Sequence, residues 1–239
     1  MKKLLLTIFI FINSLSAIDI MTENYPPFNF KNKDGKITGI TTDIVKEILK
    51  DVGEEDYSIK LMPWARAYRY ITNKPNKILF SMTRTQNREY MFKWVGPIAN
   101  NSWVLYAKAD SIIKINSLND ARNERYKIGT YIDSANELFL KDNDFYNIYS
   151  VPTDTLNLQK LIRGRIHLWA AGETQGLYKA KQLGINPNKI KKVFKIKDTQ
   201  LYIAFSRTTP NSIIHLWQSK LDAMKKDGRY QKIMDKYIK

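Results

Sequence analysis

Hydroxyl and guanidinium side chains gather in one short stretch of the chain, between Ser81 and Arg88. Ser81, Thr83 and Thr85 follow an apolar run over residues 78–80, and Arg88 comes soon after the last hydroxyl. We predict a buried strand that leads into a helix, whose first backbone N–H groups are free to bind an anion. Because a cation in the first helical turn opposes the helix dipole, Arg88 is better explained as the partner of a carboxylate, held through two parallel hydrogen bonds.

Two aromatic residues lie where they could wall the same site. Tyr25 opens the sequence Tyr-Pro-Pro-Phe, which interrupts a strand predicted over residues 18–22, because proline cannot continue a ladder of hydrogen bonds. This loop lies at the carboxyl end of the strand, where open α/β sheets bind ligands. Trp64 follows Pro63 at the start of a predicted helix. Packing against the core explains either ring equally well, so both alternatives stay open.

Residue types suited to nucleophilic or metal chemistry are scarce. The chain has no cysteine, which excludes disulfides, thiol catalysis and thiolate metal sites. The spacing of its two histidines, His167 and His215, indicates no Ser/His/Asp triad, and neither has recognisable partners for a metal ion. We therefore expect no catalytic residue, no bound metal and no cofactor.

The first 17 residues have the composition of a secretory signal peptide. Two lysines precede an apolar run over residues 4–12, and a small, polar segment ends at Ala17, where we predict cleavage. The apolar run is shorter than the roughly 18–20 residues that span a bilayer, and no later stretch is apolar enough. The lack of cysteine also removes the acylation site of a lipoprotein. We therefore expect a periplasmic protein with no stable membrane insertion.

The rest of the chain is basic but well supplied with core residues. Of the 239 residues, 44% are hydrophobic, which is enough for one large domain or two small ones. The formal net charge is +16, or +14 without residues 1–17, which carry two lysines and no acids. Secretion and the scattered basic residues argue against binding to nucleic acid. We expect a monomer with a solvated basic surface.

Strands and helices alternate along the chain, which predicts an α/β protein with a parallel sheet and crossover helices. Apolar spacing and capping residues place the helices, and Asp154 is interpreted as a helix cap. The predicted helices cover residues 41–52, 64–71, 118–125, 135–141, 154–162, 174–183, 210–226 and 230–238. The predicted strands cover residues 18–22, 57–62, 78–80, 103–107, 126–129, 146–151, 165–171, 189–197 and 200–205.

Six short motifs, in this order, are similar to those of one protein family: Tyr25-Pro-Pro-Phe28, Gly35-Lys-Ile-Thr-Gly39 with Asp43, Thr83-Arg-Thr-Gln-Asn-Arg88, Gly129, Gly164-Arg-Ile166 and Lys226-Asp-Gly-Arg-Tyr230. Together they extend over essentially the whole chain after the signal peptide. The chain resembles the periplasmic solute-binding proteins of family 3, the polar-amino-acid type of ABC transporter substrate-binding protein.

The resemblance implies a type II periplasmic-binding-protein-like fold, an α/β architecture of two lobes joined by two hinge strands. Each lobe is a mixed sheet flanked by helices, and a hinge motion clamps the ligand between the lobes. After the signal peptide of residues 1–17, residues 18–106 and 204–239 form lobe 1, and residues 107–203 form lobe 2. The hinge strands are residues 103–107 and 201–205. The closed form docks on an inner-membrane ABC permease.

The resemblance also implies which residues bind the ligand. Arg88 binds the α-carboxylate, helped by Thr83 and Ser81. Two aromatic rings sandwich the ligand, and the start of a helix in lobe 2 adds polar contacts; these residues are Tyr25, Trp64 and Ser134. The roles agree with the small carboxylate that the residue types indicate by themselves.

The chain departs from the family pattern in lobe 2. Gly172 stands where the family has an amine-binding aspartate, and His167 stands where another aspartate is expected. Glu173 is adjacent and could substitute for the missing acid. However, a shift of one residue along a strand reverses the direction of the side chain, and helix capping next to Thr174 is the alternative role that we favour.

Two arginines add positive charge that amino-acid binders of this family do not usually need. Arg66 and Arg84 face either the cleft or solvent, and we favour solvent for each. If both face the cleft and the aspartate is missing, the ligand is not a standard zwitterionic amino acid. A small anion or a dipeptide-like carboxylate then fits better, with an aromatic group suited to Tyr25, Trp64 and Trp169.

Two other functions are open on the same scaffold. An enzyme similar to cyclohexadienyl dehydratase needs a general acid beside a cyclic carboxylate, and Glu173 has this role if it faces the cleft, since burial raises a carboxyl pKa. A ligand-sensing receptor subunit is the other alternative, and it would usually carry further domains beyond residue 239. We favour a solute-binding protein that captures a small carboxylate ligand.

Overall fold

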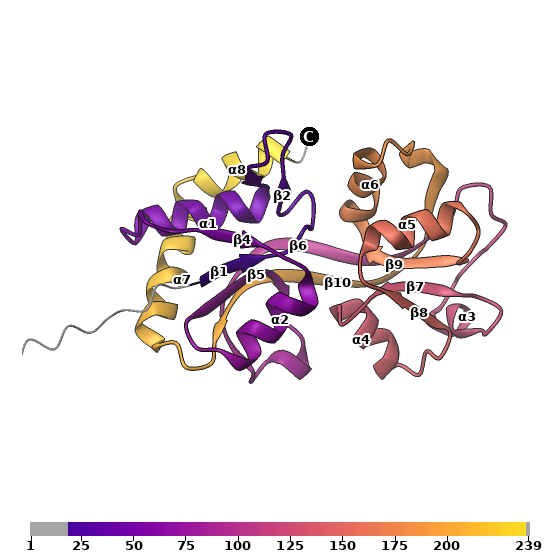
Figure 1. Cartoon of the computed structure of the whole chain (residues 1–239), viewed down its shortest axis with the longest axis horizontal. Helices are drawn as coiled ribbons and strands as arrows, with labels where there is room; N and C mark the ends of the chain where they lie inside the picture. Colours follow the sequence, from indigo (N-terminus) through magenta and orange to yellow (C-terminus); the bar gives the residue numbers. More distant parts are fainter. Residues whose placement is uncertain (1–18, 238–239) are drawn as a thin grey trace, which may run out of the picture.

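The computed structural model describes residues 19–237, so the predicted signal peptide lies outside the described residues. Two lobes lie side by side, and two long strands run from one lobe into the other (Figure 1). These strands are β6 (Phe92–Lys108) and β10 (Ile190–Ser206), which pair antiparallel along their whole length. They form the centre of a sheet with the strand order β4-β1-β5-β10-β6-β9-β7-β8. The two-lobed α/β architecture is the predicted one.

The first lobe places three parallel strands beside β10. Strand β1 (Asp19–Thr22) pairs with β4 (Ile59–Leu61) and with β5 (Lys77–Thr83), and β5 pairs antiparallel with β10. A separate hairpin of β2 (Phe30–Lys31) and β3 (Ile37–Thr38) precedes the first helix. The helices of this lobe are α1 (Ile40–Asp51), α2 (Trp64–Asn73), α7 (Asn211–Lys226) and α8 (Arg229–Tyr237).

Alternation along β5 gives the first lobe a core on each face of its sheet. Ile78 and Phe80 pack with apolar residues of α1 and α7, whereas Leu79 packs with α2 on the other face. The buried side of α2 includes Trp64 and Ile71, at the spacing expected for one face of a helix. This packing fixes Trp64 at the first turn of α2, which points toward the second lobe (Figure 1).

The second lobe adds three strands on the other side of β6. Strand β9 (Leu168–Gly172) pairs antiparallel with β6, and β7 (Ile128–Tyr131) lies parallel to both β9 and β8 (Ile148–Val151). Alternate residues of β9 face two different cores, so the whole strand is buried. The helical elements are α3 (Leu118–Arg122), α4 (Ala135–Asp142), α5 (Asp154–Ile162), α6 (Glu173–Gln182) and η2 (Pro187–Lys189).

Two segments differ from the predicted elements. The helix expected at Arg88 is only a 3-10 turn, η1 (Gln86–Arg88), and β6 begins at Phe92. Burial of Phe92 and Val95 in the cores of the first lobe outweighs the marginal stability of a short helix. The strands predicted over residues 189–197 and 200–205 form one strand, β10, because its partner β6 is equally long.

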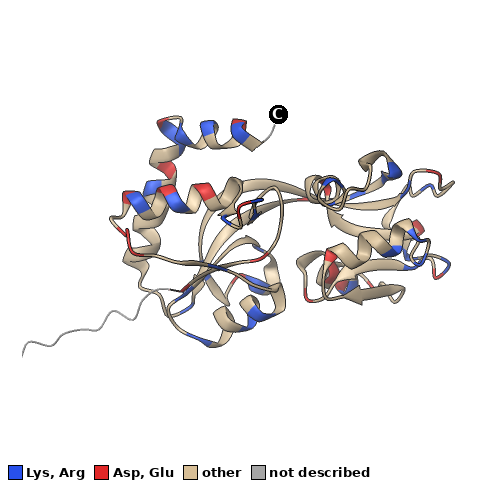
Figure 2. Cartoon of the chain, turned by 45° about the horizontal axis from the view of Figure 1, so that its top comes forward, with Lys and Arg blue, Asp and Glu red and all other residues tan. Residues whose placement is uncertain are grey.

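The predicted hinge segments, residues 103–107 and 201–205, lie within β6 and β10. The lobe boundaries that we place at residues 106/107 and 203/204 stay predictions. Lys and Arg are spread over both lobes and interspersed with Asp and Glu (Figure 2). Within residues 19–237, no helix is both long enough and apolar enough to cross a bilayer.

Candidate functional site

Two adjoining chambers lie between the lobes. The outer chamber has a volume of about 1030 Å³ and is lined by η1, α4 and both long strands. Thr83, Trp103 and Ala135 line both chambers. The inner chamber has a volume of about 50 Å³ and is lined by most of the residues predicted to bind ligand, namely Tyr25, Trp64, Ser81, Thr83, Arg88 and Ser134.

The end of β5 is bent at Ser81, which directs the following residues toward the inner chamber. Ser81 has a φ of 66° and no partner in the register between β5 and β10, so it forms a bulge. Met82 consequently packs on the α2 side of the sheet, and Thr83 lines the chamber. The Ser81 hydroxyl donates to Asn29 Oδ1 and lies 2.6 Å from Thr41 Oγ1. These bonds hold a backbone conformation that non-glycine residues seldom adopt.

Arg88 is buried in the inner chamber, with 2% of its surface exposed. Its Nη1 donates to the Thr83 carbonyl at 3.4 Å and its Nη2 to the Asp133 carbonyl at 3.3 Å, while Nε has no partner within the described residues. The guanidinium carbon lies 5.0 Å from the ring centres of both Trp64 and Tyr68. Burial lowers its pKa, but an arginine stays charged at neutral pH. This cation therefore has hydrogen-bonding capacity left for a carboxylate.

The start of α4 faces the inner chamber from the second lobe. Ser134 is the N-cap of this helix and accepts a hydrogen bond from the Glu137 backbone N–H at 3.3 Å. Ala135, the first helical residue, lines both chambers. The positive end of the helix dipole therefore adds to the attraction that Arg88 exerts on an anion.

Two carboxyl groups that the sequence analysis did not assign to the site also line the inner chamber. Glu23 follows the last residue of β1, and Asp154 is the first residue of α5. Burial, and after it the charge of Asp154, raises the pKa of Glu23 to about 8. The position of Glu23 at the carboxyl end of a strand, two residues before Tyr25, was a signal for it. For Asp154 the sequence offers only its place at a helix start.

Gly172, at the end of β9, leaves room for Tyr25 of the first lobe. A Cβ atom at Gly172 would lie 2.6 Å from the Tyr25 hydroxyl and 3.3 Å from Asn101 Oδ1. The Tyr25 hydroxyl also accepts a hydrogen bond from Asn101 Nδ2 at 2.7 Å. A side chain at residue 172 therefore does not fit in this conformation unless Tyr25 moves.

Direct hydrogen bonds between the lobes hold them together. Trp64 donates from its backbone N–H to the Tyr131 hydroxyl at 3.0 Å, and from its indole Nε1 to the Asp133 carbonyl at 2.8 Å. Arg88 reaches the same carbonyl from the first lobe. A volume of about 50 Å³ leaves space for one or two water molecules, each of which takes up roughly 30 Å³. The lobes are thus in direct contact across the inner chamber.

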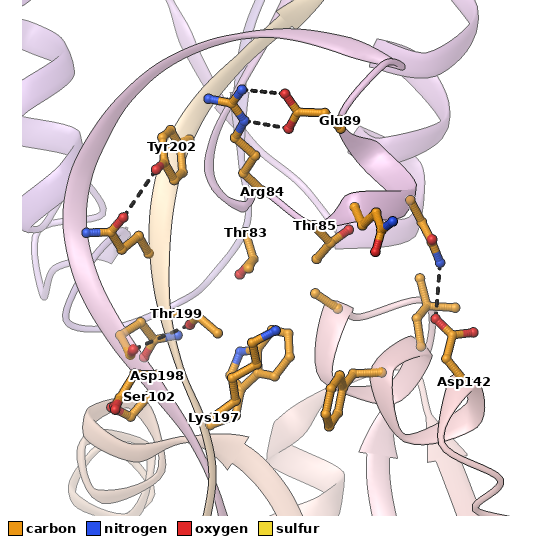
Figure 3. A pocket seen from close by; sticks show the side chains of 18 of the residues that line it. Thr83, Arg84, Thr85, Glu89, Ser102, Asp142, Lys197, Asp198, Thr199 and Tyr202 are labelled. Atoms are coloured by element: carbon orange, nitrogen blue, oxygen red, sulfur yellow. Dashed lines mark hydrogen bonds and ion pairs between the residues drawn. The ribbon is translucent and has the colours of Figure 1, made fainter.

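The outer chamber is lined by polar and apolar residues alike, and most of its charged groups bond to neighbouring side chains (Figure 3). Arg84 binds Glu89 through two hydrogen bonds, with Nε 2.7 Å from Glu89 Oε2. Asp198 accepts hydrogen bonds from Lys195 Nζ at 2.8 Å and from Ser102 Oγ at 2.7 Å. Arg84, whose position the sequence left open, therefore faces this chamber in a complete ion pair.

Glu173 and Arg66 lie outside the linings of both chambers. Glu173 is the first residue of α6 and forms an ion pair with Lys192 of β10. Its side chain is 34% exposed. Arg66 is exposed on α2. The structure therefore does not bring Glu173 together with the other residues predicted to bind ligand.

Two α/β lobes that close on a cleft, and that share two long strands, define the periplasmic-binding-protein class of ligand-binding proteins. The sequence profile of one family within this class, the bacterial extracellular solute-binding proteins of family 3, matches residues 18–239. The chain belongs to this family, which confirms the resemblance seen in its motifs.

Proteins similar to this chain include binders of amino acids. A probable histidine-binding protein of Campylobacter jejuni subsp. jejuni serotype O:2 (strain ATCC 700819 / NCTC 11168) is 26% identical over 222 residues, which cover 90% of this chain and 81% of that protein. An ancestral arginine-binding protein bound to arginine has a TM-score of 0.81 and 23% identity, over 93% of this chain and 98% of that one. A histidine kinase sensor domain with similarity to periplasmic binding proteins has a TM-score of 0.83 and 18% identity. The match covers 93% of this chain and 96% of that domain. The two solved structures confirm the predicted fold.

Proposed function

We propose that this protein captures an amino-acid-like ligand in the inner chamber and delivers it to an ABC permease of the inner membrane. It acts as a monomer in the periplasm, after removal of the signal peptide. The observation that carries the proposal is Arg88, a buried guanidinium whose Nε has no partner within the described residues and whose other two bonds are long. A carboxylate satisfies this group with two parallel, charge-assisted hydrogen bonds.

Neighbouring groups support the same pose. The Thr83 side chain and the start of α4 lie around Arg88 and can add hydrogen bonds to the carboxylate oxygens. Trp64 and Tyr25 wall the chamber from the first lobe, so both aromatic rings are placed to cover the rest of the ligand. Membership of family 3 and the similarity to amino-acid-binding proteins support an amino acid as the ligand class.

Ligand capture requires the lobes to open and then close again. Opening breaks the bonds of Trp64 to Tyr131 and Asp133, and that of Arg88 to Asp133. A bound carboxylate then replaces the Asp133 carbonyl as the partner of Arg88. The ligand therefore substitutes for contacts that hold the empty protein closed, and the motion takes place about β6 and β10.

A thermal-shift screen of the mature chain, residues 18–239, tests the proposal. The probes are amino acids, dicarboxylates and small aromatic acids. A specific ligand at 100 times its Kd stabilises the protein by about 2.7 kcal/mol, and Arg88→Met should remove this shift. The matched control is Arg66→Met, because Arg66 is exposed and lines neither chamber. The proposal is wrong if no carboxylate shifts the unfolding temperature, or if Arg88→Met leaves the shift unchanged.

Transport is distinguished from sensing by the membrane partner. Cross-linking of the ligand-loaded protein in native membranes should recover an ABC permease in a ligand-dependent manner. Recovery of a sensor kinase instead would assign the same capture site to signalling, a reading that the histidine kinase sensor domain among the similar structures keeps open.

A second candidate function is catalysis on a cyclic carboxylate, which the state of Glu23 specifically favours. A carboxyl group with a pKa of about 8 is mostly protonated at neutral pH, so it can donate its proton to a departing hydroxyl group, which leaves as water. Glu23, rather than Glu173, then has the role of general acid. Turnover of prephenate-like substrates by the wild type, lost in Glu23→Gln, would support this function, and binding without turnover would exclude it.

A further inference from the structure

Asp154 is a buried acid of the second lobe that carboxylate binding at Arg88 leaves unused. It lines the inner chamber and is 9% exposed. Its Oδ1 accepts hydrogen bonds from Trp169 Nε1 at 2.9 Å and from Asn157 Nδ2 at 3.3 Å, and its Oδ2 accepts one from Gln175 Nε2 at 2.9 Å. The three donors belong to β9, α5 and α6, so the carboxylate is held in one orientation from three elements.

The charge of this carboxylate is not matched by its hydrogen bonds. All three donors are neutral, and no ion pair of Asp154 occurs within residues 19–237. Lys179 of α6 is buried and acts on Asp154 electrostatically without forming an ion pair. A buried carboxylate is costly unless a cation pairs with it, and its oxygens offer about four acceptor sites, of which three are used here. The remaining capacity is available to a cationic donor.

Opposite charges meet in the inner chamber. Arg88 enters from the first lobe with an unpartnered Nε, and Asp154 enters from the second lobe at the start of α5, where the helix dipole favours a negative charge. Glu23 adds a second acid to the lining of this chamber. A ligand that carries both a carboxylate and a cation provides a partner for the arginine and for the aspartate. A ligand with a carboxylate alone does only the first.

Gln175 connects Asp154 to the position where the family pattern predicts an acid. Its Oε1 accepts the backbone N–H of Gly172 at 3.3 Å, while its Nε2 donates to Asp154. Asp154 is therefore one side chain away from residue 172, but it starts from a different element, α5 instead of the end of β9.

We propose that Asp154 receives the ammonium group of an α-amino acid whose carboxylate is bound by Arg88, in place of an acid at residue 172. The inference rests on the proposed function and names its substrate class as zwitterionic α-amino acids, in preference to carboxylic acids without the amine. With Asp154 in this role, Gly172 no longer requires an unusual ligand. Instead, the absence of a side chain at residue 172 leaves room for the Tyr25 hydroxyl.

Calorimetric titration of the mature chain tests this inference with two pairs of probes. Each pair is an α-amino acid and the same acid without its amine: L-histidine with imidazolepropionate, and L-arginine with guanidinovalerate. Each is titrated into the wild type, Asp154→Asn and the matched control Asp144→Asn, which removes an exposed acid that lines neither chamber. Asp154→Ser is a second variant, to be used if Asp154→Asn does not fold. Serine also suits a helix start. Circular dichroism verifies that each variant is folded.

The expected result is that Asp154→Asn weakens binding of the amino acid about 10- to 100-fold, the range of one hydrogen bond to a charged group, and leaves its des-amino partner unchanged. Equal weakening of both partners, or none of either, would overturn the role of Asp154 while the capture site stands. If the wild type binds the des-amino acids more tightly than the amino acids, the role of Asp154 is also overturned while the capture site stands. Binding of none of the four probes would overturn both this inference and an amino-acid-binding function for the chamber.

Discussion

The inner and outer chambers adjoin at Thr83, Trp103 and Ala135, but they differ in how their charges are satisfied. In the outer chamber most charged groups bond to neighbouring side chains, as in the pair of Arg84 and Glu89. In the inner chamber, within the described residues, neither Arg88 nor Asp154 forms an ion pair. Exposed pairs contribute little, whereas burying a charge without a partner is costly. A ligand with groups of opposite charge can pair with these buried, unpaired groups.

The largest expected effect comes from replacing an arginine by methionine in each chamber and comparing the two losses of affinity. Arg88→Met should weaken binding of a carboxylate ligand by about 100-fold or more, because two charge-assisted hydrogen bonds are lost. Arg84→Met removes an arginine of the outer chamber and should change the Kd by no more than about threefold. Calorimetric titration measures both. Similar losses in the two variants would mean that the chambers are not functionally distinct.

Closure of the inner chamber should depend on Gly172. Gly172→Ala places a Cβ atom 2.6 Å from the Tyr25 hydroxyl, so the closed form without ligand should become about 10-fold less populated, equivalent to overpacking by 1–3 kcal/mol. Small-angle X-ray scattering of the ligand-free variant should report a larger radius of gyration. Tyr25→Phe removes the clashing oxygen and should restore the compact form in the double variant. An unchanged radius in Gly172→Ala would show that Tyr25 yields without moving the lobes.

The raised pKa of Glu23 predicts how pH affects the ligand-free protein. The folded protein binds the Glu23 proton more tightly than the unfolded chain, whose pKa is near 4.5, so this group's stabilising contribution is complete below that pH. It is lost as the pH rises through about 8. Asp154 adds to this effect, while Lys179, Tyr131 and Arg88 oppose it.

Thermal unfolding at several pH values, for the wild type and Glu23→Gln, measures this dependence. The wild type should lose stability relative to the variant between about pH 4.5 and pH 8. Parallel curves over that range would place Glu23 in contact with solvent and remove it from the buried acids of the inner chamber.

The smallest expected effect concerns Lys197, the outer-chamber cation that lies over the Phe139 ring, with Nζ 5.5 Å from the ring centre. It is exposed, so Lys197→Met should change the Kd by no more than about twofold. A loss of tenfold or more in the same titrations would show that part of the ligand lies in the outer chamber, as expected for a dipeptide-like carboxylate.

The grouping of the hydroxyls and the arginine in one chamber could be predicted from sequence because its determinants are local. Ser81, Thr83 and Arg88 lie within one strand end and one turn, so their spacing alone brought them together. The extent of the helix after Arg88 could not be predicted, because burial of Phe92 in the sheet is a long-range effect. For the same reason two predicted strands proved to be parts of β10, whose length depends on β6.

The acidic side of the site depends on contacts that are distant in sequence. Asp154 has the local signature of a helix start, and only its bonds to Trp169 and Gln175 show that it turns into the chamber. Glu173, one residue from the expected position of an acid, instead starts α6 and binds Lys192. A pattern of residue types can locate a strand end or a helix start. It does not show which of several nearby acids faces the cleft.

The most direct test of the inner chamber as the capture site is a crystal structure of the mature chain with the amino acid that stabilises it most. The predicted result is a ligand enclosed between the lobes, with its carboxylate on Arg88 and its ammonium group on Asp154. A ligand bound in the outer chamber, with Arg88 still on the Asp133 carbonyl, would contradict the account.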